Sequence, residues 1–346
     1  MHATVIDISA TTERSAAAQY AAKRFLRSQG AVDIEAIGAH SNFNDVFCCH
    51  CAGKRYFLKA AHTRPRTLDL KIPRSRIFTE ARALDLFGEW CGELIEIPRM
   101  LHMDRQSFSF LMTDVGMGRT NLIDAMAEHY DLYILGIAAM AQAIGQVHRR
   151  SRGWPSPCPS RQSDALRTFI YDNLIAPGIS ALVGESARSV LEEMATRREC
   201  LIHSDLWAKN MLIDSAGGMA LVDYEGVLEG DPAFDLATML AAGVLPLFQY
   251  GISFDIWQHG ARQVFLGYRQ GLSDDAWFQQ IEARLMPCLA VMLATRATGP
   301  FPYAMSDTAR WQLSELCCQV IEQKLETWSD FPVLVRKLAP AQRQHH

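Results

Sequence analysis

The chain has 346 residues, of which 49% are hydrophobic, and such a chain can fill the core of two domains or of one bilobal unit. Its formal net charge of −4 argues against a nucleic-acid-binding or membrane-surface protein, because those classes usually carry a strongly basic face. The start of the chain lacks the basic and apolar regions of a signal peptide, and we expect no membrane span. We therefore expect a cytoplasmic protein with reduced cysteines.

The first third of the chain is mostly of strand type. The elements that we expect there are helices at residues 12–29 and 74–90 and strands at residues 32–39, 45–51, 55–61, 99–103 and 107–113. The first helix is alanine-rich, with Thr11 or Thr12 at its start and Gly30 after its end. The sequence "AGKR" at 52–55 predicts a tight hairpin turn between two of the strands.

The run "CCHC" at residues 48–51 contains residue types that bind metals. A second ligand pair at zinc spacing is missing from its neighbourhood in the sequence, and the alternation around it is typical of a strand. We therefore interpret this run as part of a strand and expect no metal there.

After "DVGMG" at residues 114–118 the chain is predicted to be mostly helical, and only the section around 211–224 returns to strand character. A β-rich first third followed by a larger helical remainder predicts an α+β fold with two lobes and a cleft near residues 114–118. The expected domains are an N-terminal helix at 1–30, an N-lobe at 31–115 and a helical C-lobe at 116–346.

The stretch "LIHSDLWAKNMLID", residues 201–214, places several polar groups between two apolar segments. Burying such groups without partners costs roughly 2–7 kcal/mol each, so a purely structural reason is insufficient. The following turn and strand form a predicted hairpin, which brings Asn210 and Asp223 to the same open end. Two oxygen ligands held side by side suit Mg²⁺. Asp205 lies outside this pair and is left to accept a proton.

Here the sequence resembles a known family. The spacing His203-x-Asp205-x-x-x-x-Asn210, followed by Asp223, resembles the catalytic loop and metal aspartate of protein-kinase-like phosphotransferases. The run "DYEGVLEGDPAFDLA" at 223–237 is similar to the aminoglycoside phosphotransferase and choline kinase branch, and the pattern is nearest to 5-methylthioribose kinase. The resemblance implies a bilobal, protein-kinase-like fold with a small β-rich N-lobe and a larger, mainly helical C-lobe.

The resemblance also implies a reaction, namely transfer of the γ-phosphoryl group of ATP or GTP, with Mg²⁺, to a hydroxyl of a small molecule. Asp205 would orient or deprotonate that hydroxyl, and Asn210 and Asp223 would hold the metal. Glu225 would be a further metal ligand and would also contact the substrate.

For two further residues of the same region, the resemblance and the helix-start signals predict structural roles. His203 is expected to brace the catalytic loop. Asp235 is expected near a helix start beneath the loop, where its carboxylate would accept backbone N–H groups.

The nucleotide side of the site has candidates upstream. A kinase needs a lysine on an N-lobe strand that is paired with a helix glutamate. Lys59 is flanked by apolar residues in "YFLKA", and Glu80 shares the inward face of Ile77, Ala81 and Leu84 on the next helix, so we expect the two to pair.

The loop "GAHSNFND" at residues 38–45 is expected to cover the nucleotide phosphates, with Gly38, Ser41 and Asn42 as contacts. It has one glycine where protein kinases have several, and it resembles the asparagine-bearing loops of methylthioribose kinase. The segment "LMTDVG", which includes Met112 and Asp114, looks like the hinge that would hydrogen-bond a purine.

The acceptor cannot be named from these residues. The segment "ATRATGPF" at 294–301 is similar to the paired-arginine segment that binds the sugar of methylthioribose kinase, but only Arg296 matches and Thr295 is its neighbour. Asn210 stands where that family often has serine, and "VDYE" replaces its D-P-E. Arg296 favours a neutral or anionic hydroxylated metabolite.

Two other acceptors stay open. A polycationic aminoglycoside would need acids, for which Glu282, Asp307 and Glu315 are available. A choline-like cation would need an aromatic cage, to which Trp257, Trp277, Trp311 and Tyr303 could contribute.

Two alternatives to a small-molecule kinase are weaker. A protein kinase is disfavoured because only twelve positions separate Asp223 from Asp235 and no A-P-E sequence occurs. An inactive nucleotide-binding regulator would lack a key residue, whereas Lys59, Asp205, Asn210 and Asp223 are all present. The expected partners are a nucleotide and a small hydroxylated substrate, without nucleic acid or membrane, and a homodimer stays open.

Overall fold

The computed structural model describes residues 8–37, 44–62, 72–128, 130–154, 160–182, 187–300, 302–325 and 327–339. The chain divides into two compact units. We call residues Met1–Gly88 and Ile97–Met117 unit 1, and residues Glu89–Glu96 and Gly118–His346 unit 2. The N-terminal helix thus belongs to the same unit as the sheet, and the division at Met117 lies two residues beyond the expected end of the N-lobe at residue 115.

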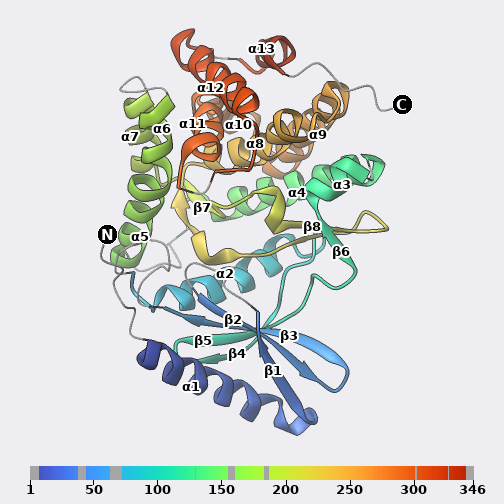
Figure 1. The fold of residues 1–346 in the computed structure, drawn as a ribbon, viewed down its shortest axis with the longest axis vertical. Coiled ribbons are helices and arrows are strands. Elements are labelled where there is room, and N and C mark those ends of the chain that lie inside the picture. Colours follow the sequence, from blue (N-terminus) through green and yellow to red (C-terminus); the bar gives the residue numbers. More distant parts are fainter. Residues whose placement is uncertain are drawn as a thin grey trace. The chain divides into compact units, whose positions relative to one another are not determined.

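Unit 1 is built on a five-stranded antiparallel sheet in the order β1-β2-β3-β5-β4 (Figure 1). Its elements are α1 (Ile8–Leu26), η1 (Arg27–Gln29), β1 (Val32–Ala36), β2 (Asn44–Cys51), β3 (Lys54–Ala61), α2 (Arg76–Cys91, assigned to unit 2 from Glu89 on), β4 (Met100–Asp104) and β5 (Ser109–Thr113). Ala52 and Gly53 join β2 to β3 with φ of 51° and 73°, the left-handed pair that a two-residue hairpin turn requires. The five strands and both helices occur where the sequence predicts them, with shifted ends.

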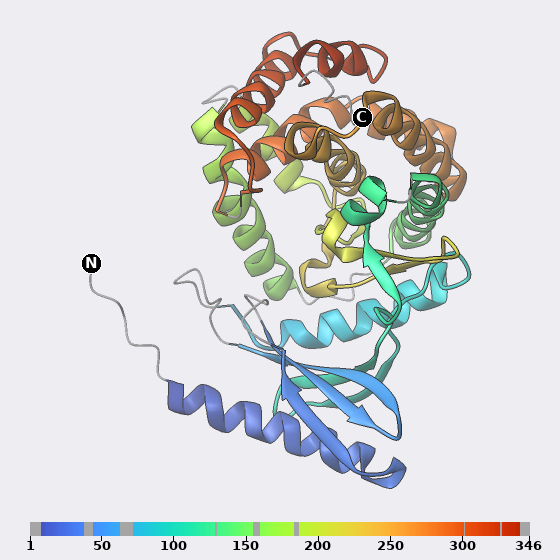
Figure 2. The ribbon, with the colours of Figure 1, turned by 45° about the vertical axis from the view of Figure 1, so that its right-hand side comes forward.

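Helix α1 covers one face of this sheet, as Figure 2 shows. Ala18, Ala22 and Leu26 pack on side chains of β2, β3 and β5. The helix begins at Ile8, earlier than the predicted start at Thr11 or Thr12, and its last predicted turn is a 3₁₀ helix before Gly30. Side chains alternate along a strand, so residues adjacent to the α1-facing positions, such as Lys59, lie on the opposite sheet face.

Unit 2 is mainly helical, as predicted. Its helices are α3 (Leu122–Glu128), α4 (Tyr130–Ser151), α5 (Ser160–Thr168), the π-helix η2 (Phe169–Ile175), α6 (Ala176–Leu182), α7 (Arg188–Thr196), α8 (Pro232–Tyr250), α9 (Phe254–Leu272), α10 (Asp275–Glu282), α11 (Leu285–Thr298), α12 (Asp307–Glu322) and α13 (Phe331–Leu338).

Two small sheets accompany these helices. The strands are β6 (Arg119–Asn121), β7 (Cys200–Ile202), β8 (Met211–Asp214), β9 (Met219–Leu221) and β10 (Leu228–Gly230). The hairpin β8–β9 lies in the section predicted to be strand. The other three strands were not predicted, because each has three residues and, unlike β9, none follows a recognisable hairpin turn.

Helices α4 and α9 approach each other closely because small residues line their contact. A Cβ atom on Gly271 would lie 2.0 Å from the backbone oxygen of Gln142, and one on Gly267 would lie 2.3 Å from that of Ala138. Both distances are far below van der Waals contact, so the separation of the two helices depends on glycine at these positions.

Helix α8 forms the centre of unit 2. It is the one helix among the described residues that is long and apolar enough to cross a membrane, although the sequence led us to expect none. The apolar window is 89% buried inside the unit, which is the environment of a core helix. Asp231 caps its first turn by accepting the N–H of Ala233 at 2.9 Å.

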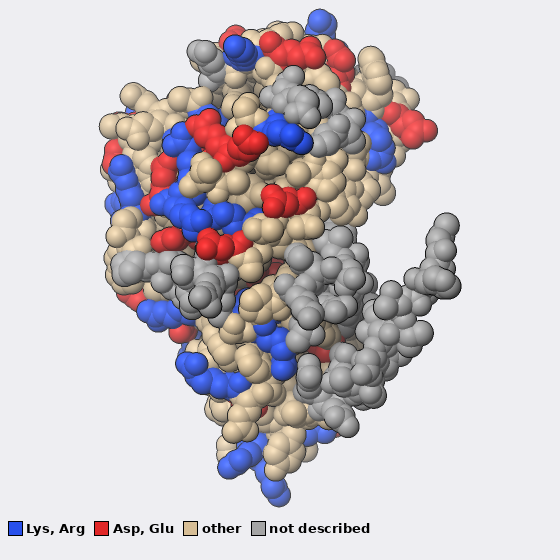
Figure 3. Space-filling view, turned by 90° about the vertical axis from the view of Figure 1, so that its left-hand side faces the viewer, with Lys and Arg blue, Asp and Glu red and all other residues tan. Residues whose placement is uncertain are grey.

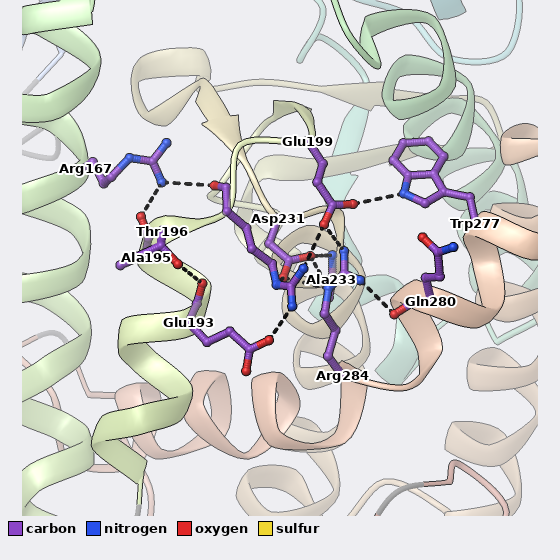
Figure 4. Close-up of polar contacts among 11 residues, drawn as sticks. Arg167, Glu193, Ala195, Thr196, Glu199, Asp231, Ala233, Trp277, Gln280 and Arg284 are labelled. Atoms are coloured by element: carbon purple, nitrogen blue, oxygen red, sulfur yellow. Dashed lines mark hydrogen bonds and ion pairs between the residues drawn. The ribbon is translucent and has the colours of Figure 1, made fainter.

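An ionic network joins the cap of α8 to the start of β7 (Figure 4). Arg284 Nε donates to both carboxylate oxygens of Asp231, at 2.9 and 2.8 Å, and Arg284 Nη2 donates to Glu199 at 2.7 Å. Glu199 also accepts from Trp277 Nε1 at 3.0 Å. Burial by itself raises the pKa of Glu199, but the hydrogen bonds from Trp277 and Arg284 and the charges of Arg284 and Arg197 outweigh it and lower that pKa.

Charged side chains of both signs are interspersed on the face drawn in Figure 3. Among the residues described there, lysines and arginines lie next to aspartates and glutamates rather than in a separate basic region. This distribution agrees with the small net charge of the chain.

We predict that Gly271→Ala destabilises unit 2, because the new methyl group meets the backbone of α4. Overpacking of this kind costs about 1–3 kcal/mol or more, measured as the free energy of unfolding in urea. Gly88→Ala is the matched control, because Gly88 lies in α2 with nothing within 4 Å of an added Cβ. That substitution should stabilise the protein by up to about 1 kcal/mol. Equal effects of the two changes would contradict the packing argument.

We also predict a pH-dependent effect of Glu199→Gln. The pKa of Glu199 is lower in the folded state, so its stabilisation is complete above the ordinary value of 4.5 and is lost as the pH falls. At pH 7 the variant should lose about 1–3 kcal/mol of unfolding free energy, the usual contribution of a hydrogen bond to a charged group. The loss should shrink towards pH 4.

The control for this experiment is Glu192→Gln, which removes the same charge from an exposed position on α7. Its effect should stay within about 0.5 kcal/mol at every pH. A deficit of Glu199→Gln that stays constant between pH 7 and pH 4 would show that the carboxylate charge is not responsible.

Candidate active site

The segment 203–210 follows a short strand pair in unit 2. Strand β7 pairs with β10 in an antiparallel register, and the chain then leaves β7 through His203 to Trp207. A 3₁₀ turn, η4 (Ala208–Asn210), leads into β8, which pairs with β9 and with β6. Regular strands therefore hold both ends of this loop, which fixes the directions of its polar side chains.

Asp205 is the centre of a group of polar contacts. The side-chain amide of Asn210 donates to the Asp205 carboxylate at 2.6 Å and to its backbone oxygen at 2.9 Å. Arg296 Nη2 lies 3.5 Å from Asp205 Oδ1, and Lys209 Nζ lies 3.8 Å from Oδ2. The Asp205 side chain is 25% exposed, so a ligand can still reach it.

The hairpin brings Asp223 next to Asn210, as its sequence predicts. Val222 donates its backbone N–H to the backbone oxygen of Asn210 at 3.0 Å, and Asp223 follows directly. Asp223 adopts left-handed backbone geometry with φ of 69°, which costs a non-glycine residue about 1–2 kcal/mol. Such strain at a polar loop residue is typical of functional sites. Glu225 follows in the turn η5 (Tyr224–Gly226).

A second left-handed residue, Ser204, lies against this turn. Ser204 Oγ donates to the backbone oxygen of Gly226 at 2.6 Å. A Cβ atom on Gly226 would lie 2.4 Å from the same Oγ, so glycine is needed for the close approach. The contact joins the loop that carries Asp205 to the turn that carries Glu225.

The fully buried carboxylate of Asp235 supports the loop from below. It accepts the backbone N–H of His203 at 2.7 Å and that of Ser204 at 2.8 Å. His148 Nε2 lies 3.2 Å from the same carboxylate, and Tyr268 lies 2.8 Å from His148 Nδ1. Burial raises the pKa of Tyr268 well above its ordinary value, which keeps its hydroxyl protonated. An ionised Asp235 can only accept, so a proton on Nε2 of His148 would satisfy it and would leave Nδ1 to accept from Tyr268.

His203 is also completely buried. Its ring meets that of Tyr224 edge-on, with centroids 4.9 Å apart, and its Nδ1 accepts the backbone N–H of Asp205 at 3.3 Å. One contact lies within the loop and the other joins the loop to the turn η5 that begins at Tyr224, and both are of the kind that the bracing role expected for His203 requires. The acceptor position expected for Asp235, in the first turn of α8, is likewise the one observed.

The residues at the open end of the hairpin fit a hard divalent cation. The Nδ2 group of Asn210 donates to two acceptors on Asp205, which assigns the amide and leaves Oδ1 on the other side as an oxygen ligand. The carboxylates of Asp223 and Glu225 are further oxygen donors. A set of two or three oxygens without sulfur or imidazole is the type that Mg²⁺ prefers.

A small pocket of about 60 Å³ opens beside Asp205. Ser204, Asp205, Thr295 and Arg296 provide its polar atoms. Its apolar wall comes from η2, α8 and α11, for example Leu174, Phe234 and Met292. A mostly apolar pocket with a few converging polar groups is the usual form of a small-molecule site.

Arg296 is held against two aromatic rings at this pocket. Its guanidinium carbon lies 4.2 Å from the Trp207 ring centroid and 5.8 Å from that of Tyr303. Burial raises the pKa of Tyr303, and the nearby Arg296 charge opposes that rise without cancelling it. The Arg296 side chain is 15% exposed, so its position is largely determined before any ligand arrives.

In unit 1, Lys59 and Glu80 form the pair that the sequence predicts. Lys59 Nζ donates to Glu80 Oε1 at 2.6 Å, and both side chains are almost completely buried. Asn44 Nδ2 lies 3.4 Å from Glu80 Oε2, and Arg76 donates to Asn44 Oδ1 at 2.9 Å. Pairing compensates the cost of burying each charge.

The remaining candidates of unit 1 are of two kinds. Gly38, Ser41 and Asn42 lie outside the described residues, so their expected phosphate contacts stay predictions. Met112 lies in β5 and is 9% exposed. The Asp114 side chain, in contrast, is used within the unit, where it accepts from Arg55 Nε at 2.5 Å and from the N–H of Gly116 at 2.7 Å.

Several residues of the site were not found from the sequence. Trp207 lies two residues after Asp205, and this position inside the loop could have indicated that its ring belongs to the site. His148 and the π-helix wall carry no local motif, because they reach the site only through packing. Of the aromatic residues considered for a cage, Trp257 and Trp277 are buried and Trp311 is 64% exposed.

Comparisons with known proteins address the family. Residues 52–269, more than half of the chain, match the model of the phosphotransferase enzyme family. A comparison with curated proteins gives no match. Among solved structures, the amicoumacin kinase hAmiN in complex with AMP-PNP, Ca²⁺ and Ami is 17% identical, covering 94% of this chain and 98% of its own, with a TM-score of 0.55.

Two other solved structures are also similar. The choline kinase LicA from Streptococcus pneumoniae is 14% identical, covering 92% of this chain and 96% of its own, with a TM-score of 0.47. A choline/ethanolamine kinase family protein from Mesorhizobium loti is 16% identical, covering 92% and 99%, with a TM-score of 0.47. The family match, the α+β architecture and the amicoumacin kinase fold agree with the resemblance found in the sequence: the chain belongs to the phosphotransferase enzyme family and has its protein-kinase-like fold.

Proposed function

We propose that this protein is a small-molecule kinase that transfers the γ-phosphoryl group of a nucleoside triphosphate to a hydroxyl of a metabolite. The observation that carries the proposal is the polar group around Asp205. Its carboxylate is oriented by Asn210 at 2.6 Å and faces a small pocket, while Asp223 lies at the end of the adjoining hairpin. Phosphoryl transfer depends mainly on such positioning and on charge neutralisation.

In this mechanism Asp205 accepts a hydrogen bond from the acceptor hydroxyl and takes its proton as the hydroxyl oxygen bonds to the γ-phosphorus. The bond from that phosphorus to the bridging oxygen breaks at the same time, and the nucleoside diphosphate leaves with that oxygen. Asn210 holds the Asp205 carboxylate in one orientation through its amide N–H. Lys59, fixed by Glu80, binds the nucleotide phosphates. These residues raise the rate by positioning the reactants and by transferring a proton, and none of them forms a covalent bond to the phosphoryl group.

Asn210, Asp223 and Glu225 would hold Mg²⁺, which neutralises charge on the phosphate oxygens when it is bound. The amicoumacin kinase with the same fold was solved with AMP-PNP and Ca²⁺, which supports a nucleotide and a divalent cation as ligands here. Both ATP and GTP fit this chemistry.

The pocket supports a neutral or anionic hydroxylated acceptor. Arg296 Nη2 lies 3.5 Å from Asp205 Oδ1, so its guanidinium would be near an acceptor hydroxyl bound to that carboxylate. An acceptor with a carboxylate, a phosphate or several hydroxyl oxygens would gain charge-assisted hydrogen bonds from it. The apolar wall would cover the remainder of such a molecule.

Two alternative acceptors are less well supported. A choline-like cation needs open aromatic faces, but those of Trp207 and Tyr303 are next to the Arg296 guanidinium. A polycationic aminoglycoside needs several acids, and among the described residues that line the pocket Asp205 is the one acid. Glu282, Asp307 and Glu315 do not line it.

The function is tested by offering the purified protein Mg²⁺ with ATP or GTP and a panel of acceptors that contains hydroxylated acids, sugars, aminoglycosides and choline. Nucleotide consumption should depend on an acceptor of the first two classes. With that acceptor, Asp205→Asn should reduce turnover about 10²–10⁴-fold, because a positioned base contributes that factor. Near-normal turnover of the variant would remove Asp205 from the reaction.

The matched control is Asp255→Asn, which changes an exposed aspartate on α9 whose side chain is 81% exposed. Its turnover should equal that of the unchanged protein. Consumption that is greatest with aminoglycosides or choline would replace the proposed acceptor class without affecting the role of Asp205.

A second prediction concerns Arg296. Arg296→Ala should raise the KM for the acceptor about 10- to 100-fold, because a charge-assisted hydrogen bond contributes about 1.5–3 kcal/mol. The affinity for nucleotide, measured by calorimetry, should not change. Arg269→Ala is the control, since Arg269 is exposed on α9. An effect of Arg296→Ala on nucleotide affinity alone would place this residue in a different role.

A further inference from the structure

The sheet of unit 1 carries a second group of residues with ligand chemistry. Glu35, Cys48 and His50 each offer one ligand atom, and these atoms all lie within 4.8 Å of one another. None of the three takes part in the proposed phosphoryl transfer. They lie on the sheet face opposite to the one that α1 covers, because Cys49 and Cys51 between and beside them face α1.

Strand pairing brings the three together. Glu35 of β1 stands directly opposite Cys48 of β2 in the antiparallel register, and His50 follows two residues later on the same side of β2. Strands β1 and β2 are neighbours in Figure 1. Because these positions belong to a regular ladder, the backbone holds the three side chains close together before any ion binds.

The distances match those of a tetrahedral metal site. Cys48 Sγ lies 3.3 Å from His50 Nε2, and the same Nε2 lies 3.4 Å from Glu35 Oε1. Zinc is bound at about 2.3 Å by sulfur and about 2.0–2.2 Å by nitrogen and oxygen, and tetrahedral angles then put neighbouring ligand atoms about 3.4–3.6 Å apart. The two observed separations are close to these edges.

Hydrogen bonding alone explains the arrangement less well. If His50 Nε2 is unprotonated, it can accept a hydrogen bond from the Cys48 thiol, and if it is protonated, it can donate one to Glu35. It cannot do both at once, although it lies within hydrogen-bond distance of both groups. A single cation at the centre would satisfy the sulfur, the nitrogen and the oxygen together.

We propose that Glu35, Cys48 and His50 bind a divalent cation of the Zn²⁺ class, with a fourth position open to water. Thiolate and imidazole ligands select such borderline cations over Mg²⁺, so this site differs in kind from the oxygen ligands Asn210 and Asp223. Cys48 is 4% exposed, whereas the side chains of His50 and Glu35 are 51% and 70% exposed. An ion can therefore enter from solvent and rest on the sulfur.

Two neighbouring groups affect the charge at this site. Arg55 lies close enough to interact electrostatically with Cys48, and its guanidinium would oppose a cation. Arg55 Nε is bound to Asp114 at 2.5 Å, however, so its charge is compensated by a carboxylate. A bound ion would cross-link β1 to β2 and would stabilise unit 1 by mass action.

The test is a titration of the reduced, metal-free, full-length protein with Co²⁺, which reports a thiolate ligand by its sulfur-to-metal charge-transfer absorption. One equivalent should produce this absorption, and Zn²⁺ should abolish it. Cys48→Ser should remove it, whereas Cys318→Ser, which changes a partly exposed thiol in unit 2, should leave it unchanged. Co²⁺ bound at Asn210 and Asp223 would give no thiolate absorption.

Variants of the two exposed ligands test the proposal even if Cys48→Ser does not fold. His50→Gln and Glu35→Gln should each weaken Co²⁺ binding at least about 10- to 100-fold, the loss that even outer partners of metal ligands produce. Asp33→Asn removes the same charge as Glu35→Gln from the position opposite His50 and should have little effect. Absence of a thiolate band in the unchanged protein, or equal losses for Glu35→Gln and Asp33→Asn, would overturn the proposal.

Discussion

The geometry of the loop that carries Asp205 depends on one buried carboxylate. Asp235 accepts two consecutive backbone N–H groups, those of His203 and Ser204, and it is itself reached by His148 from α4. Ser204 and Asp223 both have left-handed backbone, which is unfavourable for residues other than glycine. The hydrogen bonds to Asp235 and to Gly226 stabilise the left-handed backbone at Ser204. Asp235, which has no role in the proposed reaction, therefore helps to determine where Asp205 lies.

The same helix end is anchored on its other side by charge. Asp231 caps α8 and binds Arg284, which also binds Glu199 immediately before β7. Helix α8 and strand β7 are therefore joined twice, by the ionic network before the loop and by Asp235 at the loop itself. Each member of the network has a partner of opposite charge, and this pairing offsets the desolvation that burial of single charges would cost.

Much of this arrangement can be predicted from the sequence, and the remainder depends on packing. The spacing of His203, Asp205, Asn210 and Asp223 carries the family, and the apolar flanks of Lys59 predict its pairing with Glu80, because burial demands a partner of opposite charge. The strands β6, β7 and β10 were missed because each has three residues and, unlike β9, lacks a recognisable hairpin turn beside it. The run that holds Cys48 and His50 was considered for metal binding and interpreted as a strand without a metal, because the sequence does not show that strand register brings Glu35 beside it.

The π-helix η2 has a consequence for how the pocket beside Asp205 could change its shape. Residues 169–175 form a wider turn between two α-helical segments, and Ile170, Leu174 and Ile175 from it line the pocket. A π-helical turn holds one more residue than an α-helical turn. Deleting a single residue here would restore the tighter turn, so the flanking α-helical segments would keep their register and the side chains within the turn itself would change position. The loss of one residue could thus reshape this wall of the pocket while Asp205 and its supporting hydrogen bonds remain unchanged.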